Sequence, residues 1–138
     1  TEISNGESMV AELVAQCRQT TSKLILSYHN FDETPDEQFI LDRLSAAQQL
    51  GGDVAKVAVM PKNYKDVLTL LSATYTARTE LLDIPIITMS MGAEGAVTRI
   101  AGGLFGSDLT FAIGKASSAP GQIPIDDLRK AWTALSFE

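Results

Sequence analysis

The chain has 138 residues, of which 45% are hydrophobic and 20% are charged, so it is long enough to bury the core of one globular domain. Its formal net charge of −6 argues against nucleic acid as a partner, because phosphate binding requires a clustered basic surface. No apolar run approaches the roughly 20 residues of a membrane span, and no secretory signal is visible at the start. The single cysteine, Cys17, cannot form an internal disulfide, which is typical of a reducing compartment and predicts a cytoplasmic protein.

Helix and strand signals alternate from the start of the chain. The apolar spacing predicts an opening helix over about residues 7–19, and Leu24–Tyr28 is typical of a buried strand. The segment Thr34-Pro35-Asp36-Glu37 matches a capping box, in which Thr34 accepts an early helix N–H and Pro35 takes the first helical position. Apolar residues at helical spacing then continue to Gly51-Gly52, which ends the helix.

The alternation continues through the second half. We expect strands at Val54–Met60, Ile84–Met89 and Leu109–Ile113, each a short apolar run. Helices are expected after Asn63, over Ala93–Ala101, and near the end of the chain, where the apolar residues at helical spacing are Leu128, Trp132 and Leu135.

Continuously apolar strands that alternate with helices predict a parallel sheet covered by helices. Four such units fit either a small doubly wound α/β sheet or half of a (β/α)₈ barrel. The pattern alone does not choose between the two architectures.

Lys56 lies inside the apolar strand Val54–Met60, so its side chain is expected to point into the protein. Desolvation disfavours the ammonium and lowers the pKa of such a lysine, which leaves free amine available as a nucleophile near pH 7. The residues alone leave open a second interpretation, a lysine that guards an edge strand against aggregation.

His29 is the only histidine, and it follows a strand. A lone histidine in such a place is commonly a hydrogen-bonded structural residue. However, catalytic groups collect at the C-terminal ends of parallel strands, and an imidazole can move protons near neutral pH.

Several motifs resemble the type I 3-dehydroquinate dehydratases. They are Ser27-Tyr28-His29-Asn30-Phe31-x-x-Thr34-Pro35, Lys56-Val57-Ala58-Val59-Met60-Pro61, Ser90-Met91-Gly92, Arg99 and Ser117-Ser118-Ala119-Pro120-Gly121-Gln122. The resemblance covers essentially the whole chain. It implies a (β/α)₈ TIM barrel, of which residues 1–138 would be a single unit of about the last four βα repeats, a C-terminal half-barrel.

The resemblance also implies roles for five residues. Lys56 would form a Schiff base with a ketone, and His29 would move protons beside the imine. Arg99 would pair with the substrate carboxylate, although without the motif it reads as a surface arginine on a short helix. Ser118 and Gln122 would bond substrate oxygens from a lid loop. Three further residues match apolar pocket positions, for which strand core is an equal reading: Met89, Met91 and Phe111.

The implied reaction is a lyase step of the shikimate pathway, which serves aromatic amino acid biosynthesis: 3-dehydroquinate loses water to give 3-dehydroshikimate. It would need no metal and no organic cofactor, because the iminium itself is the electron sink. Two alternatives stay open, an imine-forming aldolase on the same barrel and a catalytically inactive half-barrel that folds by self-association. A receiver-like module is disfavoured, because the strand ends lack the acidic residues that it requires.

The resemblance also predicts gaps. The family's upstream arginines and acids, which include a glutamate that bonds the catalytic histidine, are not expected to have counterparts in this chain. The family's Asp-x-Glu element would place its glutamate at Glu2 and its aspartate before the first residue. The chain is therefore expected to start inside a strand of the family pattern. A half-barrel would expose two strand edges and an inner face with Ile25, Val57 and Ile87. We expect it to form a homodimer or to pair with a complementing N-terminal half.

Overall fold

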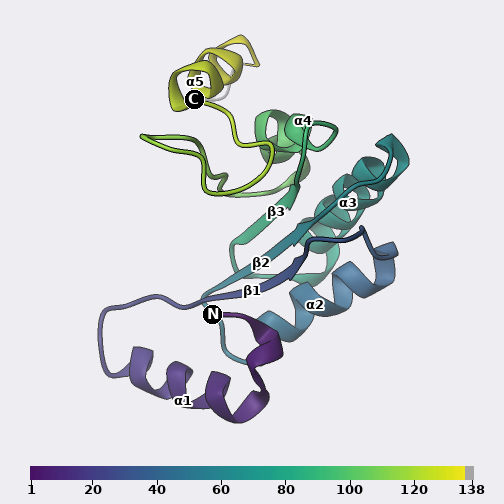
Figure 1. Cartoon of the computed structure of the whole chain (residues 1–138). Helices are drawn as coiled ribbons and strands as arrows, with labels where there is room; N and C mark the ends of the chain where they lie inside the picture. Colours follow the sequence, from purple (N-terminus) through teal and green to yellow (C-terminus); the bar gives the residue numbers. More distant parts are fainter. Residues whose placement is uncertain (136–138) are drawn as a thin grey trace.

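Three parallel strands, in the order β1-β2-β3, lie at the centre of the molecule (Figure 1). The computed structural model describes residues 1–135. The strands are β1 (Ile25–Asn30), β2 (Val54–Val59) and β3 (Ile86–Ser90). Because parallel neighbours require a crossover connection, each strand is joined to the next through helical segments, as the alternation in the sequence predicts.

The helices that connect the strands are α2 (Glu37–Gln49) and α3 (Tyr64–Thr76), and Figure 1 shows both on the same side of the sheet. The remaining helical elements are α1 (Glu7–Arg18), α4 (Ala96–Ala101), α5 (Ile125–Ala134), the 3₁₀ turns η1 (Ile3–Asn5) and η3 (Gly102–Phe105), and the π-helical turn η2 (Ala77–Leu81). Within residues 1–135, no helix has the length and apolar character that crossing a membrane would require.

The capping box expected at the start of α2 is wrong, because a different residue caps the helix. Asp36, not Thr34, is the N-cap, and its carboxylate accepts a hydrogen bond of 2.8 Å from the Phe39 N–H. The Thr34 hydroxyl instead donates to the Met60 carbonyl at the end of β2, at 3.0 Å. Aspartate caps a helix at least as well as threonine does, so the helix can begin two residues later than expected. The Thr34 side chain is then available to bond the end of the sheet.

The two faces of the sheet have different environments. Alternate residues, such as Leu26, Ala55 and Val57, pack with α2 and α3 in the larger hydrophobic cluster. The opposite face, called here the inner face, carries a smaller cluster that includes Ile87 and Met89. The expected exposure of apolar inner-face residues is therefore wrong in two cases, because Val57 belongs to the helix-covered face and Ile87 is fully buried.

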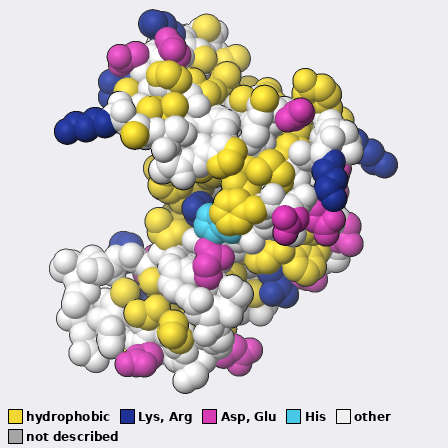
Figure 2. Space-filling view, viewed as in Figure 1, with side chains coloured by type: hydrophobic (Ala, Val, Ile, Leu, Met, Phe, Trp, Pro, Cys, Tyr) yellow, Lys and Arg dark blue, Asp and Glu magenta, His cyan; other side chains and the backbone are white. Residues whose placement is uncertain are grey.

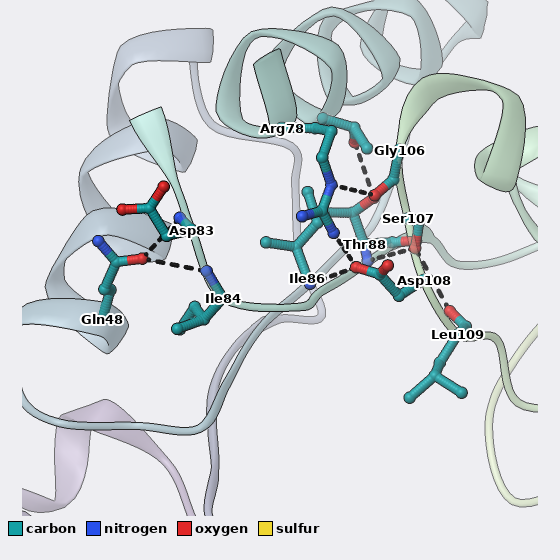
Figure 3. Close-up of polar contacts among 11 residues, drawn as sticks. Gln48, Arg78, Asp83, Ile84, Ile86, Thr88, Gly106, Ser107, Asp108 and Leu109 are labelled. Atoms are coloured by element: carbon teal, nitrogen blue, oxygen red, sulfur yellow. Dashed lines mark hydrogen bonds and ion pairs between the residues drawn. The ribbon is translucent and has the colours of Figure 1, made fainter. Parts of the chain in front are cut away.

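The expected fourth strand at Leu109–Ile113 does not form; within residues 1–135 this segment makes one isolated bridge, between Ile113 and Pro124. Two side chains just before this segment bond the outer edge of β3 (Figure 3). The Asp108 carboxylate accepts from the Ile86 N–H at 2.7 Å, and the Ser107 hydroxyl accepts from the Thr88 N–H at 3.0 Å. Because these two backbone N–H groups of β3 are already bonded to side chains, they are not available to pair with the backbone of a fourth strand.

The opposite edge of the sheet is also bonded over part of its length. The first two residues run parallel to β1: the Thr1 carbonyl accepts from the Ser27 N–H at 2.8 Å, and Glu2 pairs with Ser27. The expectation of two open strand edges is therefore wrong at these positions. The pairing also brings Glu2 beside the inner face, where the candidate site lies.

Candidate active site

His29 and Lys56 meet on the inner face because of the strand register. Ser27 lies beside Lys56, and Ala58 lies beside His29, so the two polar side chains are diagonal neighbours on one face. Ala58 has only a methyl group and leaves room between them. The Lys56 Nζ atom is 2.9 Å from the His29 Nε2 atom. The structure thus brings together the two residues predicted to be catalytic.

Glu2 completes a chain of three polar groups. Its Oε1 atom lies 2.5 Å from His29 Nδ1, the other ring nitrogen. With Nδ1 donating to the carboxylate, Nε2 keeps its lone pair and faces Lys56. The expectation that the histidine has no glutamate partner in this chain is wrong. The signal was present in the sequence, since the Asp-x-Glu element places a glutamate at this position, but its contact with His29 depends on the pairing of residues 1–2 with β1.

Burial lowers the pKa of the Lys56 ammonium. The nearby guanidinium of Arg99 lowers the pKa of Lys56 further, whereas the negative charge of Glu2 raises it. The ring of Phe111 lies over the ammonium, with 4.9 Å between Nζ and the ring centroid. The ring favours the ammonium, whereas burial makes the neutral, nucleophilic amine more accessible than it is at an exposed lysine, in the direction that the strand pattern predicts.

Arg99 of α4 is one of the most deeply buried side chains, with 2% of its surface exposed. Its Nη1 donates to the Phe111 carbonyl at 3.3 Å and its Nη2 donates to the Pro120 carbonyl at 3.0 Å. Its Nε is buried and has no hydrogen-bond partner among the described residues. Burial lowers the pKa of this guanidinium. The reading of Arg99 as a surface residue is wrong, and its Nε–H is an unsatisfied buried donor, which is rare in a folded protein.

Ser118 and Gln122 lie in the loop that precedes α5, and they bond each other. The Ser118 N–H donates to Gln122 Oε1 at 2.7 Å, and Gln122 Nε2 donates to the Ser118 hydroxyl at 3.0 Å. Their polar groups are thus held together at one place on the loop.

All five predicted site residues line one cavity of about 210 Å³. The other lining residues are Phe31, Ala58, Met89, Met91, Phe111, Ala119 and Pro120. Figure 2 shows the histidine, in cyan, in the hollowed part of the surface with a basic and an acidic side chain next to it. Met89, Met91 and Phe111 all line this cavity, and Met89 and Met91 also belong to the buried cluster of the inner face, so both readings of these two residues hold. Phe31, for which the motif alone predicted no site role, also lines the cavity, and its ring stacks on His29 with 5.8 Å between centroids and 8° between planes.

A larger cavity of about 310 Å³ lies elsewhere, between α4, the 107–110 segment and Trp132 of α5. It shares Arg99 with the site but contains neither Lys56 nor His29. Residues 1–135 hold no group of three or more His, Cys, Asp and Glu side chains suited to a metal ion. The smaller cavity, which contains both Lys56 and His29, is therefore the candidate active site.

Comparison with known proteins gives one consistent family. The family described as type I 3-dehydroquinase matches residues 1–137. The 3-dehydroquinate dehydratase of Geobacillus thermodenitrificans is 57% identical over 129 residues, which are 94% of this chain and 50% of that protein. The 3-dehydroquinate dehydratase of Bacillus subtilis is 45% identical over 134 residues, 97% of this chain and 52% of that protein. The chain thus spans about half the length of the curated relatives it matches.

Solved structures agree. The crystal structure of the 3-dehydroquinate dehydratase of Geobacillus kaustophilus superposes with a TM-score of 0.95 at 50% identity, covering 98% of this chain and 52% of that one. The type I enzyme of Clostridium difficile, described with covalently modified comenic acid, gives a TM-score of 0.93 at 43% identity, covering 98% and 53%. These neighbours are TIM barrels, so the barrel class is confirmed over the doubly wound alternative.

Proposed function

Since the chain belongs to the type I 3-dehydroquinase family, we propose that it supplies the imine-forming part of a lyase site that converts 3-dehydroquinate into 3-dehydroshikimate in the shikimate pathway. The observation that carries this proposal is the contact of 2.9 Å between the Lys56 amine and His29 Nε2, in a cavity that also holds a buried arginine. An aldolase-type barrel would share the lysine, but the family match extends over the whole site.

In the first step, the Lys56 amine attacks the ring ketone of the substrate, and loss of water gives an iminium. The lowered pKa of Lys56 favours this step because only the neutral amine is a nucleophile. The iminium withdraws electrons from the neighbouring carbon, which makes its proton acidic.

In the second step, His29 Nε2 takes that proton, and the ring expels its hydroxyl group with the proton that His29 returns. Glu2 stabilises the imidazolium that exists between the two transfers, because its carboxylate accepts from Nδ1–H. Hydrolysis of the product imine consumes one water and frees Lys56, so the net change is the loss of one water from the substrate.

Arg99 is the proposed carboxylate anchor. Its unpartnered Nε–H and a neighbouring Nη2–H form one edge of the guanidinium, which suits two carboxylate oxygens. Ser118 and Gln122 would exchange their mutual hydrogen bonds for bonds to the ring hydroxyls. A loop closed over the ring would also exclude water while the imine forms.

Reduction with borohydride tests the role of Lys56. With 3-dehydroquinate present, it should attach one ligand mass at Lys56, located by peptide mass spectrometry. Lys62, Lys65 and Lys115 are internal controls, and labelling there in place of Lys56 would contradict the assignment.

The variant His29→Ala separates the imine step from proton transfer. It should still give the borohydride adduct at Lys56, but turnover in the complete enzyme should fall on the order of 10²–10⁴-fold, the usual cost of losing a general acid–base. Near-normal turnover would refute the role of His29.

We further propose that residues 1–138 form a single unit, that the protein is cytoplasmic, and that its partner is a second copy or a complementing N-terminal half. The proposal of a partner is supported by the large apolar side chains that are exposed, such as Tyr64 and Leu68.

A further inference from the structure

The loop of residues 114–122 is seated against the segment that follows β3 through two glycines. Gly121 has a φ of +74°, and a Cβ built on it would lie 2.1 Å from the Gly92 carbonyl oxygen and 2.8 Å from the Gly92 carbonyl carbon. Both of these are backbone atoms, which cannot move aside as a flexible side chain could. Only glycine allows the two backbones to come this close.

Arg99 bonds the same loop at Pro120, the residue before Gly121. Its Nη2 donates to the carbonyl of Pro120, and its Nη1 donates to the carbonyl of Phe111. The guanidinium is buried, so these bonds are shielded from water. The loop is therefore held at adjacent residues, by a charged side chain at Pro120 and by close backbone contact at Gly121.

The position of this contact decides where the polar groups of the loop lie. Ser118 and Gln122 flank Pro120 and Gly121, and their side chains bond each other on the wall of the 210 Å³ cavity. A shift of Gly121 away from Gly92 would displace both groups from their places on the cavity wall that they share with Lys56. The same shift would pull on the Pro120 carbonyl and so disturb Arg99.

We propose that Gly121 is a positioning residue: its contact with Gly92 seats the 114–122 loop so that Ser118, Gln122 and Arg99 face a ligand bound at Lys56. What the loop covers rests on the proposed function, but the seating itself is a property of the free protein. Gly121 touches no reacting atom, so its effect on the reaction passes through the loop.

Hydrogen–deuterium exchange followed by mass spectrometry measures the seating without substrate. In Gly121→Ala, exchange in peptides that cover residues 114–122 should rise on the order of tenfold, because the loop opens locally. Peptides that cover β1, β2 and β3 should exchange as in the unsubstituted protein. A rise of equal size throughout the chain, or no rise in the loop, would overturn the proposal.

Two further variants separate close contact with Gly92 from backbone strain at a positive φ and from the replacement of a loop glycine as such. Gly121→Asn tolerates a positive φ better than alanine does but still adds a Cβ, so it should open the loop as Gly121→Ala does. Wild-type exchange in this variant would show that close approach to Gly92 is not what matters. Gly114→Ala lies in the same loop, where an added Cβ meets nothing within 4 Å, and should leave exchange unchanged.

Borohydride trapping with 3-dehydroquinate supplies the second measurement. Gly121→Ala should raise the concentration needed for half-maximal labelling about tenfold, with Lys56 still the labelled residue. If the unsubstituted protein gives no adduct while the exchange pattern holds, the proposed function fails and the seating stands. If the unsubstituted protein is labelled and Gly121→Ala changes neither exchange nor labelling, the seating fails and the function stands.

Discussion

At the scale of single residues, the site contains three polar groups in contact along a line. Glu2 contacts His29, and His29 contacts Lys56. Burial and Arg99 lower the pKa of Lys56, while Glu2 opposes them. Glu2 therefore has two effects, because it orients the imidazole that we propose as the proton acceptor and it also favours the protonated, unreactive form of the lysine.

Removing the charge of Glu2 tests this balance. In Glu2→Gln the pKa of Lys56 should fall further, because the negative charge that favours the ammonium is gone. The pH dependence of borohydride trapping at Lys56 should then move to lower pH. Glu12→Gln, an equal change of charge at an exposed position of α1, should leave the profile unchanged. A shift of the Glu2→Gln profile to higher pH would contradict the assigned interaction.

At the scale of elements, Asp53 joins the end of α1 to the start of the sheet. Its carboxylate accepts from the Leu24 N–H at 2.9 Å and from Arg18 at 3.0 Å. The bond from Leu24, followed by that from Arg18, lowers the pKa of Asp53 to about 2. Elsewhere the elements are held in similar ways: Gln48 of α2 bonds the N–H groups of Asp83 and Ile84 just before β3 (Figure 3).

The lowered pKa makes the contribution of Asp53 dependent on pH. A carboxylate with a depressed folded-state pKa stabilises the fold fully above its unfolded value of about 3.9, and this stabilisation is lost as the pH falls toward 2. Asp53→Asn should therefore lower the urea midpoint at pH 7, and the difference from the unsubstituted chain should shrink between pH 4 and pH 2.

The comparison requires one fixed chain concentration, because association would otherwise change the apparent stability. Asp32→Asn, in the exposed loop after β1, is the matched control for loss of one negative charge and should show little difference at any pH. A difference for Asp53→Asn that stays constant down to pH 2 would count against the ionised bonds.

At the scale of the whole molecule, the chain has about half the length of its relatives and a sheet of three strands. Several large apolar side chains are exposed, among them Tyr64 at 71% and Leu68 at 65% on α3, and Leu109 at 54% at the larger cavity. Such surface favours contact with another polypeptide.

We therefore expect the isolated chain to associate and to catalyse poorly. Association buries the exposed apolar groups, but a second copy of the same segment does not supply the half of the relatives' length that this chain leaves unmatched. Sedimentation equilibrium at several concentrations, with a turnover assay on the same samples, measures both properties. A compact monomer whose activity equals that of a full-length relative would contradict this expectation.

Local patterns were sufficient for much of the fold and the site. The strand signals around His29 and Lys56, and the helices between them, are confirmed because apolar periodicity and turn residues act over a few neighbouring positions. The meeting of the two residues follows from parallel pairing of consecutive strands. Arg99, Ser118 and Gln122 required the family motifs, since nothing in their local sequence distinguishes them from a surface arginine and a turn.

The sequence by itself determined the alternation of helices and parallel strands through β3, and its motifs indicated the barrel family and singled out Lys56 as the proposed nucleophile. Only the tertiary structure decided that Glu2 bonds His29, that Asp36 rather than Thr34 caps α2, and that Ser107 and Asp108 occupy the edge where a fourth strand was expected. Each of these outcomes is a choice of hydrogen-bond partner between several available groups. The choice depends on which groups the folded chain brings within about 3 Å, and distance in space is not written in the spacing of residues along the chain.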